Sequence, residues 1–176
     1  MTSAGLHVRR ARTTDVRAIK ELVDGYAAQN ILLAKDLVTL YEDLPEFWVA
    51  EEGGVLLGCG ALHVLWEDLG EVRTVAVQPE LRGRGVGHAL VDSLIAAARE
   101  LGLRRLFVLT FETAFFAGHG FVEISDSPVP PEVHRLMRRS YDPGVAEFLD
   151  LPLVRPNILG NTRMLLALPP TCSTRM

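Results

Sequence analysis

Residues 75–88 carry the pattern with the clearest chemical meaning in this chain. An apolar stretch leads into a glycine-dense turn that contains Arg82 and Arg84, and a helical pattern begins at Val86. Glycine permits positive φ and a close approach of the backbone to a ligand, and the free amides of a helix N-terminus attract an anion. The two arginines add positive charge. The turn is therefore predicted to bind phosphate.

Two well-known phosphate loops do not match this turn. A P-loop requires Gly-Lys followed by Ser or Thr, whereas His88 follows Gly87 here. The dinucleotide fingerprint requires glycines at its first, third and sixth positions, whereas Gly83, Gly85 and Gly87 alternate. A glycine turn with a purely structural role is the remaining alternative.

Hydrophobic periodicity and breaker residues predict the elements that position the turn. Apolar residues at steps of three and four predict a long helix over 86–101, which Gly102 ends. Further helices are predicted from residue 16 to 26 and over 36–42, 113–118, 132–140 and 143–149, and strands over 6–10, 47–51, 55–65, 71–77, 105–110, 121–124 and 162–168. This order predicts an α/β domain around a mixed, mostly antiparallel sheet flanked by helices.

Length and composition limit the possible classes of function. The chain has 176 residues, 48% of them hydrophobic, which predicts one domain over 1–176 with a core at about 6–168 and a flexible tail at 169–176. A net charge of -4 argues against a nucleic-acid partner. The sequence contains no signal peptide or membrane span, so a cytoplasmic location is expected. Cys59 and Cys172 predict neither a disulfide nor a metal site, and Cys59 is expected in the core.

The turn Arg82-x-x-Gly85-x-Gly87 resembles the acyl-CoA pyrophosphate loop of the GNAT superfamily of N-acetyltransferases. The predicted order of elements is similar to that fold from Val8 to Leu168. Segments 71–82, 106–110 and 115–121, with 31–35 and 161–165, resemble the acetyltransferase domain of bacterial N-acetylglutamate synthases, and in particular their short, stand-alone actinobacterial form. Larger synthases carry an N-terminal kinase-like domain that binds arginine, and this sequence has no residues to build it, so arginine inhibition through that domain is not predicted.

The resemblance implies that acetyl-CoA is the co-substrate, with no metal. In the family, a backbone amide near Val75 stabilises the oxyanion and the amide of Val77 pairs with the pantetheine. The cofactor-binding residues implied in this way are Val75, Ala76, Val77, Arg82, Gly83, Arg84, Gly85, Val86, Gly87, His88 and Phe116.

The resemblance also places a general base at Glu71, at the start of the strand beside the cofactor. A base is needed because an α-ammonium group is mostly protonated at neutral pH and cannot attack a thioester. The alternative is a solvated strand-end carboxylate near Arg73. Many relatives carry an acid tyrosine where this chain has Phe116, so the hydroxyl of Thr110 is the candidate that could assist the leaving thiolate. Thr110 could equally close a turn.

Recognition of an amino-acid substrate requires cations and hydroxyl donors. Lys35, Thr162 and Arg163 align with the substrate-binding segments of the family, and Arg73 is a further candidate. His63, His88 and His119 lie on different predicted elements and are interpreted as core or loop residues. Phe115, Phe116 and Phe121 are expected to pack, and the arginines at 135, 138 and 139 to form a solvated helix face, a border of the CoA phosphates or a subunit contact.

The function expected from these features is acetyl-CoA:L-glutamate N-acetyltransferase, the first step of arginine biosynthesis, by direct transfer in a ternary complex. One alternative is the same chemistry on glutamine, another amino acid or a protein N-terminus. Another is a non-catalytic acyl-CoA-binding module. The expected partner is a small-molecule substrate, and exposed edge strands make a homodimer an option.

Overall fold

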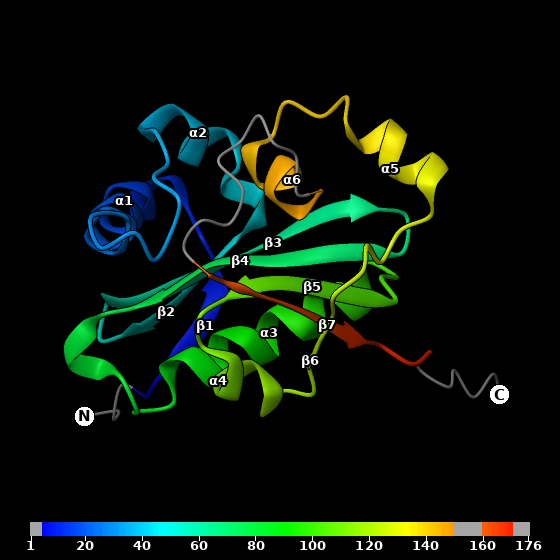
Figure 1. Cartoon of the computed structure of the whole chain (residues 1–176). Coiled ribbons are helices and arrows are strands. Elements are labelled where there is room, and N and C mark those ends of the chain that lie inside the picture. Colours follow the sequence, from blue (N-terminus) through cyan, green and yellow to red (C-terminus); the bar gives the residue numbers. More distant parts are fainter. Residues whose placement is uncertain (1–4, 150–159, 171–176) are drawn as a thin grey trace, which may run out of the picture.

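A seven-stranded sheet with helices on both faces forms the part of the chain, residues 5–149 and 160–170, that the computed structural model describes (Figure 1). The strand order is β1-β2-β3-β4-β5-β7-β6. The strands are β1 (His7–Arg10), β2 (Phe47–Glu52), β3 (Val55–Trp66), β4 (Leu69–Val77), β5 (Arg105–Thr110), β6 (Val122–Glu123) and β7 (Thr162–Ala167). The pairs are antiparallel except β4 and β5, which are parallel.

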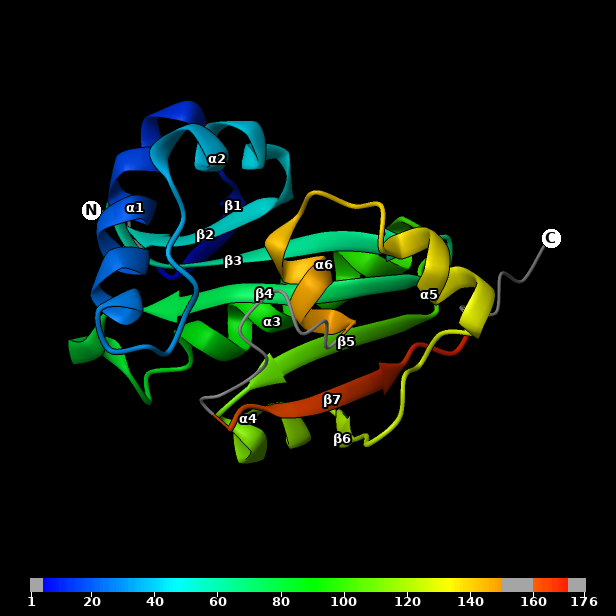
Figure 2. The ribbon, with the colours of Figure 1, turned by 45° about the horizontal axis from the view of Figure 1, so that its top comes forward.

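The helices divide between the two faces of the sheet. Helices α3 (Val86–Glu100) and α4 (Thr113–Ala117) lie on one face, and α1 (Val16–Ala27), α2 (Leu37–Glu42), α5 (Pro131–Met137) and α6 (Pro143–Phe148) lie on the other (Figure 2). The crossover α3 connects the parallel strands β4 and β5, and its buried stripe includes Leu90, Val91, Leu94 and Ala98. This is the face that the apolar periodicity predicted.

Strands β4 and β5 separate beyond residue 71. Their pairing runs from Leu69 opposite Arg105 to Glu71 opposite Phe107, although both strands continue further. In the same region β4 carries an extra residue relative to β3, because Cys59 pairs with Ala76 whereas Ala61 pairs with Arg73. Thr74, with φ of 57°, lies in this bulge. The chain therefore opens the sheet between β4 and β5 next to a bulge.

The bulge exchanges the two faces of β4. Val72 and Val75, three positions apart, pack in the same core cluster beneath α3, whereas Ala76 packs in the cluster with α1. In an unbroken strand, residues three apart lie on opposite faces. Side chains at 71 and 73 consequently face the α6 side of the sheet, and those at 75 and 77 face the α3 side.

The predicted elements are all present, with small differences at their ends. The strand expected over 121–124 is confined to Val122–Glu123, because Phe121 is buried against Phe116 instead of continuing the strand. The helix expected over 132–140 ends at Met137. Cys59 is fully buried, as predicted, whereas Cys172 and most of the expected flexible tail lie outside the described residues. Within the described part, no helix is long and apolar enough to cross a membrane.

Candidate active site

A cleft with a volume of about 410 Å³ lies where β4 and β5 separate. Its walls come from the α3 side of both strands, including Val72, Val75 and Val77 of β4 and Val108 and Thr110 of β5. One end of the cleft is closed by the glycine turn, since Arg82, Gly83, Gly85, Gly87 and His88 also line it.

The glycines of the turn satisfy specific steric requirements. Gly83 and Gly85 have φ of 77° and 82°, a region that residues with a Cβ seldom adopt. Gly85 is the N-cap of α3 and no side chain caps that helix, so the first amides of α3 are available to a ligand. A Cβ on Gly87 would lie 3.3 Å from the ring of Phe115. The turn is built to present backbone amides to an anion.

Tyr26 of α1 supports the turn from the other face of the sheet. Its hydroxyl donates to the carbonyl oxygen of Val77 at 2.6 Å and accepts from Nε and Nη2 of Arg82 at 3.3 and 3.1 Å. The guanidinium of Arg82 also lies 5.4 Å from the centre of the Tyr26 ring. In the sequence, Tyr26 is the last residue of the helix predicted from residue 16 to 26. Its position in a helix contained no signal of this polar contact.

A second, polar cavity of about 260 Å³ adjoins the cleft on the α6 side of the sheet. The two cavities share six lining residues, which are Ile31, Leu32, Val72, Arg73, Thr74 and Leu109. Lys35, Glu71, Asp142 and Asn161 line only the polar cavity. The bulge at Thr74 is thus the junction between a long, largely apolar cleft and a smaller, charged cavity.

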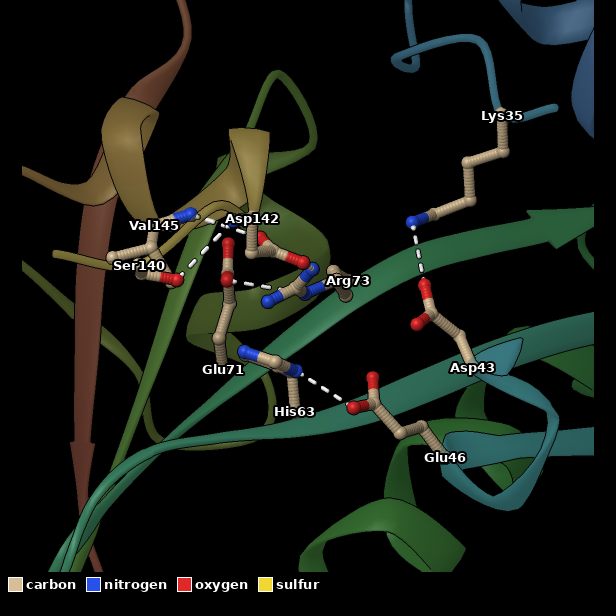
Figure 3. A network of polar contacts seen from close by, with 9 residues as sticks. All are labelled: Lys35, Asp43, Glu46, His63, Glu71, Arg73, Ser140, Asp142 and Val145. Atoms are coloured by element: carbon tan, nitrogen blue, oxygen red, sulfur yellow. Dashed lines mark hydrogen bonds and ion pairs between the residues drawn. The ribbon is translucent and has the colours of Figure 1, made fainter. Parts of the chain in front are cut away.

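Glu71 is buried, with 5% of its surface exposed, instead of being a solvated strand-end carboxylate. Burial raises its pKa to about 7, and the positive charge of Arg73, whose Nε lies 3.2 Å from Oε2 of Glu71, opposes that shift (Figure 3). A carboxyl group with this pKa is divided between its two protonation states at neutral pH. It can therefore accept and release a proton there.

Arg73 connects Glu71 to helix α6. Its Nη1 donates to both carboxylate oxygens of Asp142 at 3.0 Å (Figure 3). Asp142 is also the N-cap of α6, where it accepts the backbone N–H of Val145 at 3.0 Å. Burial acts to raise the pKa of Asp142, but the charge and hydrogen bonds of Arg73 hold it below its ordinary value. Burial raises the pKa of the nearby Glu147.

Thr110 closes a turn, which is one of the two roles considered for it. Its Oγ1 accepts the backbone N–H of Glu112 at 2.9 Å, which closes the turn after β5. Thr110 also lines the cleft, and a hydroxyl that accepts one hydrogen bond retains its own hydrogen for donation. Phe116, in the position where relatives carry tyrosine, lines the cleft and packs edge-on against Phe115 and Phe121.

The predicted substrate residues are only partly brought together. Lys35 and Arg73 line the polar cavity, and Nζ of Lys35 lies 3.3 Å from Oδ2 of Asp43. Arg163 stacks over Phe107 and Phe148, at 5.1 and 5.8 Å from their ring centres, and lines neither cavity. Thr162 also lines neither cavity, whereas its neighbour Asn161 lines the polar one.

Some residues of the predicted cofactor set are not in the cleft. Ala76 and Val86 are buried in the core, and Arg84 is exposed, so none of the three side chains lines the cavity. Ordinary strand alternation explains Ala76, because the side chain between Val75 and Val77 points to the opposite face of the sheet. Contacts of their backbone atoms with a cofactor remain a prediction.

The histidines are not merely scattered core or loop residues. Nδ1 of His88, which lines the cleft, lies 2.9 Å from Nε2 of His119, and Nδ1 of His119 lies 3.1 Å from Asp92. His63 bonds to Glu46 close to Glu71. No group of three or more metal-ligating His, Cys, Asp or Glu side chains occurs among the residues that the structure describes.

Comparison with known proteins identifies the family. Residues 17–122 match the model of the Acetyltransferase (GNAT) family. The chain belongs to this family. It is 66% identical over 164 residues to the amino-acid acetyltransferase of Mycobacterium tuberculosis strain H37Rv, an alignment that covers 92% of this chain and 94% of the relative.

Two solved structures extend the comparison. A Mycobacterium tuberculosis protein in complex with CoA and a ligand designated NLQ is 66% identical, with a TM-score of 0.89, over 92% of this chain and 99% of that one. The N-acetylglutamate synthase of Neisseria gonorrhoeae, in complex with coenzyme A and N-acetyl-glutamate, is 28% identical with a TM-score of 0.74, and the match covers 94% of this chain but 35% of the longer protein.

These comparisons confirm several expectations from the sequence. The GNAT fold, the resemblance to amino-acid acetyltransferases, the assignment as an acetyltransferase enzyme and the use of acetyl-CoA are confirmed. A small-molecule substrate is likewise confirmed. The roles of individual site residues remain predictions.

Proposed function

We propose that this chain transfers the acetyl group of acetyl-CoA to the α-amino group of L-glutamate, by direct attack within a ternary complex. The supporting observation is the junction of the two cavities at Thr74, with buried Glu71 on the side of the polar one. A thioester in the long cleft and an amine in the polar cavity would meet there. The product, an N-acetylated amino acid, fits the first step of arginine biosynthesis.

The glycine turn binds the diphosphate of CoA in this proposal. The free amides at the start of α3 and the guanidinium of Arg82 supply the positive charge. The pantetheine lies along the apolar wall that Val75, Val77 and Val108 form between the separated strands. The backbone of β4 then positions the thioester carbonyl.

Glu71 accepts a proton from the substrate ammonium group, directly or through water. The free amine then attacks the thioester carbonyl, and a backbone amide near Val75 stabilises the oxyanion. Collapse of the tetrahedral intermediate breaks the C–S bond, and the departing sulfur takes up the second proton of the nitrogen, which gives the neutral amide and the CoA thiol. The hydroxyl of Thr110, which lines the cleft, donates a hydrogen bond to the departing sulfur.

Lys35 and Arg73 bind the carboxylates of the amino acid. L-Glutamine is a second candidate because the described lining of the polar cavity holds four acidic residues, Asp36, Glu71, Asp142 and Glu147, but only these two basic ones. That balance suits an α-ammonium group and opposes a second carboxylate on the substrate. A neutral side-chain amide avoids the repulsion.

Thiol release with acetyl-CoA and a panel of free amino acids tests the proposal. Glutamate is expected to give the highest kcat/KM, and a markedly higher value for glutamine would select the second candidate. A panel in which no amino acid raises thiol release above background would reject the amino-acid assignment. Mass spectrometry of the product, with an acetyl group on the α-nitrogen, completes the test.

The proposal extends to how the chain assembles and where it acts. The chain is proposed to act as one catalytic domain in the cytoplasm, as a homodimer. The edges of the described sheet are the short strands β1 and β6, and Val122 of β6 is 63% exposed. Light scattering coupled to size-exclusion chromatography should give twice the monomer mass, and a monomer mass at micromolar concentration would reject the dimer.

A further inference from the structure

His63 lies directly opposite Glu71 in the ladder between β3 and β4. Directly opposed residues of an antiparallel pair share a face, with Cβ atoms about 4.5–5.5 Å apart. Figure 3 shows the imidazole ring between Glu71 on one side and Glu46 on the other. The ring therefore lies between the candidate base and a second carboxylate, to which it is hydrogen-bonded.

The bond to Glu46 determines the tautomer of His63. Nδ1 lies 2.7 Å from Oε1 of Glu46, which belongs to the 3-10 turn Leu44–Glu46. An ionised carboxylate only accepts hydrogen bonds, so Nδ1 is assigned the ring proton. The Nε2 atom of the neutral ring is then a free acceptor on the side of Glu71.

Exposure increases along this series of groups. The side chain of Glu71 is 7% exposed, that of His63 is 20% exposed and that of Glu46 is 26% exposed. Glu71 faces the polar cavity, which an amino-acid substrate would occupy. When substrate fills that cavity, the route from Glu71 to solvent therefore passes through His63 on the opposite strand, β3.

The reaction creates a need for such a route. The substrate nitrogen loses two protons between ammonium and amide. One of them remains with the CoA thiol, and the other must reach solvent in every turnover. If Glu71 accepts that proton, Glu71 must give it up before the next substrate binds.

We infer that His63, supported by Glu46, is a proton relay that returns Glu71 to its ionised form after each acetyl transfer. Protonated Glu71 donates its proton to Nε2 of His63, and the imidazolium forms between two carboxylates. The imidazolium passes its Nδ1 proton by way of Glu46 to water, and proton exchange with water then returns the neutral ring to the tautomer with the proton on Nδ1. The inference rests on the proposed function, with Glu71 as the base.

The surrounding charges are compatible with a transient imidazolium. Glu46 faces the ring from the 3-10 turn, Glu71 and Arg73 come from β4, and Asp142 comes from the start of α6. Arg73 is held by Glu71 and Asp142, which leaves Glu46 as the direct partner of His63. Among these groups Glu46 contacts the ring directly, and Glu71 lies opposite His63 on the neighbouring strand.

The test compares His63→Asn with wild type in steady-state kinetics at low buffer concentration. The asparagine amide keeps a donor near the place of Nδ1 but cannot carry a proton. We expect kcat to fall about tenfold or more while the KM for acetyl-CoA changes less than about twofold. Added imidazole should restore kcat in proportion to its concentration. His134→Asn, on α5, is the matched control and should leave both constants unchanged.

Glu46→Gln keeps an acceptor for Nδ1 but removes the negative charge, and a smaller fall in kcat is expected. An unchanged kcat in His63→Asn, or a reduced kcat that imidazole does not restore, would overturn the relay. The second result would identify a packing role. The wild-type enzyme tests the proposed function independently of the relay. That function is rejected if no amino acid causes thiol release by the wild-type enzyme.

Discussion

At the scale of single residues, the proposed chemistry depends most on Glu71, the candidate base. The sequence indicated a carboxylate at the start of a strand but could not distinguish a solvated residue from a buried one. Its burial depends on helix α6, which covers that face of β4 from about 70 residues later in the chain. A pKa raised to about 7 is a consequence of that long-range packing.

Glu71→Gln should reduce kcat by about a hundredfold or more and leave the KM for acetyl-CoA nearly unchanged. The wild-type kcat should rise with pH through about 7, as the carboxylate forms, and this limb should be absent in the variant. Stopped-flow or steady-state thiol release over pH 5.5–8.5 measures both effects. Glu123→Gln, on the edge strand β6, is the control. A near-normal rate in the Glu71 variant would remove Glu71 as the base.

The same substitution has a predictable effect on stability. The folded pKa of Glu71, about 7, lies above its ordinary value of 4.5, so the stabilisation that its neutral form provides is present at low pH and is lost as pH rises through 7. Glutamine does not ionise. The free energy of unfolding of Glu71→Gln relative to wild type should therefore increase between pH 5 and pH 8, by on the order of 3 kcal/mol. Urea unfolding at the two pH values measures this, and a constant difference would contradict the assigned pKa.

Thr110 can be tested by separating its two roles. Thr110→Val removes the hydroxyl at nearly constant shape and should destabilise the fold by about 1 kcal/mol, because the N–H of Glu112 loses its acceptor. If the hydroxyl also assists the leaving sulfur, kcat should fall several-fold. Thr110→Ser keeps the hydroxyl and is the control. Loss of stability with an unchanged kcat would restrict Thr110 to closing the turn.

At the scale of elements, the longer helices and strands were predictable because their apolar residues recur with a regular period. The bulge at Thr74 was not, since Thr74 occurs in a continuous run of strand-forming residues and has no glycine signal for its φ of 57°. The family resemblance nevertheless placed the oxyanion site near Val75. For Arg163, the family resemblance implied a substrate-binding position. The resemblance gave no sign that the guanidinium stacks on Phe107 and Phe148.

Asp142 couples the start of α6 to the polar cavity. Asp142→Asn should keep the N-cap and weaken the hold on Arg73, so the KM for the amino acid should rise several-fold with little change in stability. Asp142→Ala should raise KM similarly and also destabilise the fold by about 1 kcal/mol through loss of the cap. Kinetics and thermal unfolding of the pair provide the measurement. Equal stability of the two variants would contradict the capping role, and an unchanged KM would contradict the role in the cavity.

At the scale of the whole molecule, elements from both faces of the sheet hold the proposed cofactor cleft, because Tyr26 of α1 bonds to the turn that precedes α3. Binding of acetyl-CoA should therefore stabilise the entire fold. At a hundred times its Kd, acetyl-CoA should add about 2.7 kcal/mol to the free energy of unfolding and raise Tm by about 5–10 °C.

Arg82→Met should reduce that rise in Tm, because the guanidinium that is proposed to bind the cofactor phosphates is lost. Calorimetric titration should give a Kd for acetyl-CoA about tenfold higher and less sensitive to salt. Arg104→Met, an exposed arginine that does not line the cleft, is the control. Equal shifts in the two variants would exclude Arg82 from the phosphate site.

The shared wall between the two cavities has a consequence for inhibition. Six residues line both spaces, so the two cavities adjoin each other at the bulge, where the proposed thioester and amine would meet. A single molecule that joins the sulfur of CoA to the α-nitrogen of an amino acid by a short acyl spacer could occupy both at once. The second half would then bind at a high effective concentration, and such a tethered compound should be held far more tightly than either substrate.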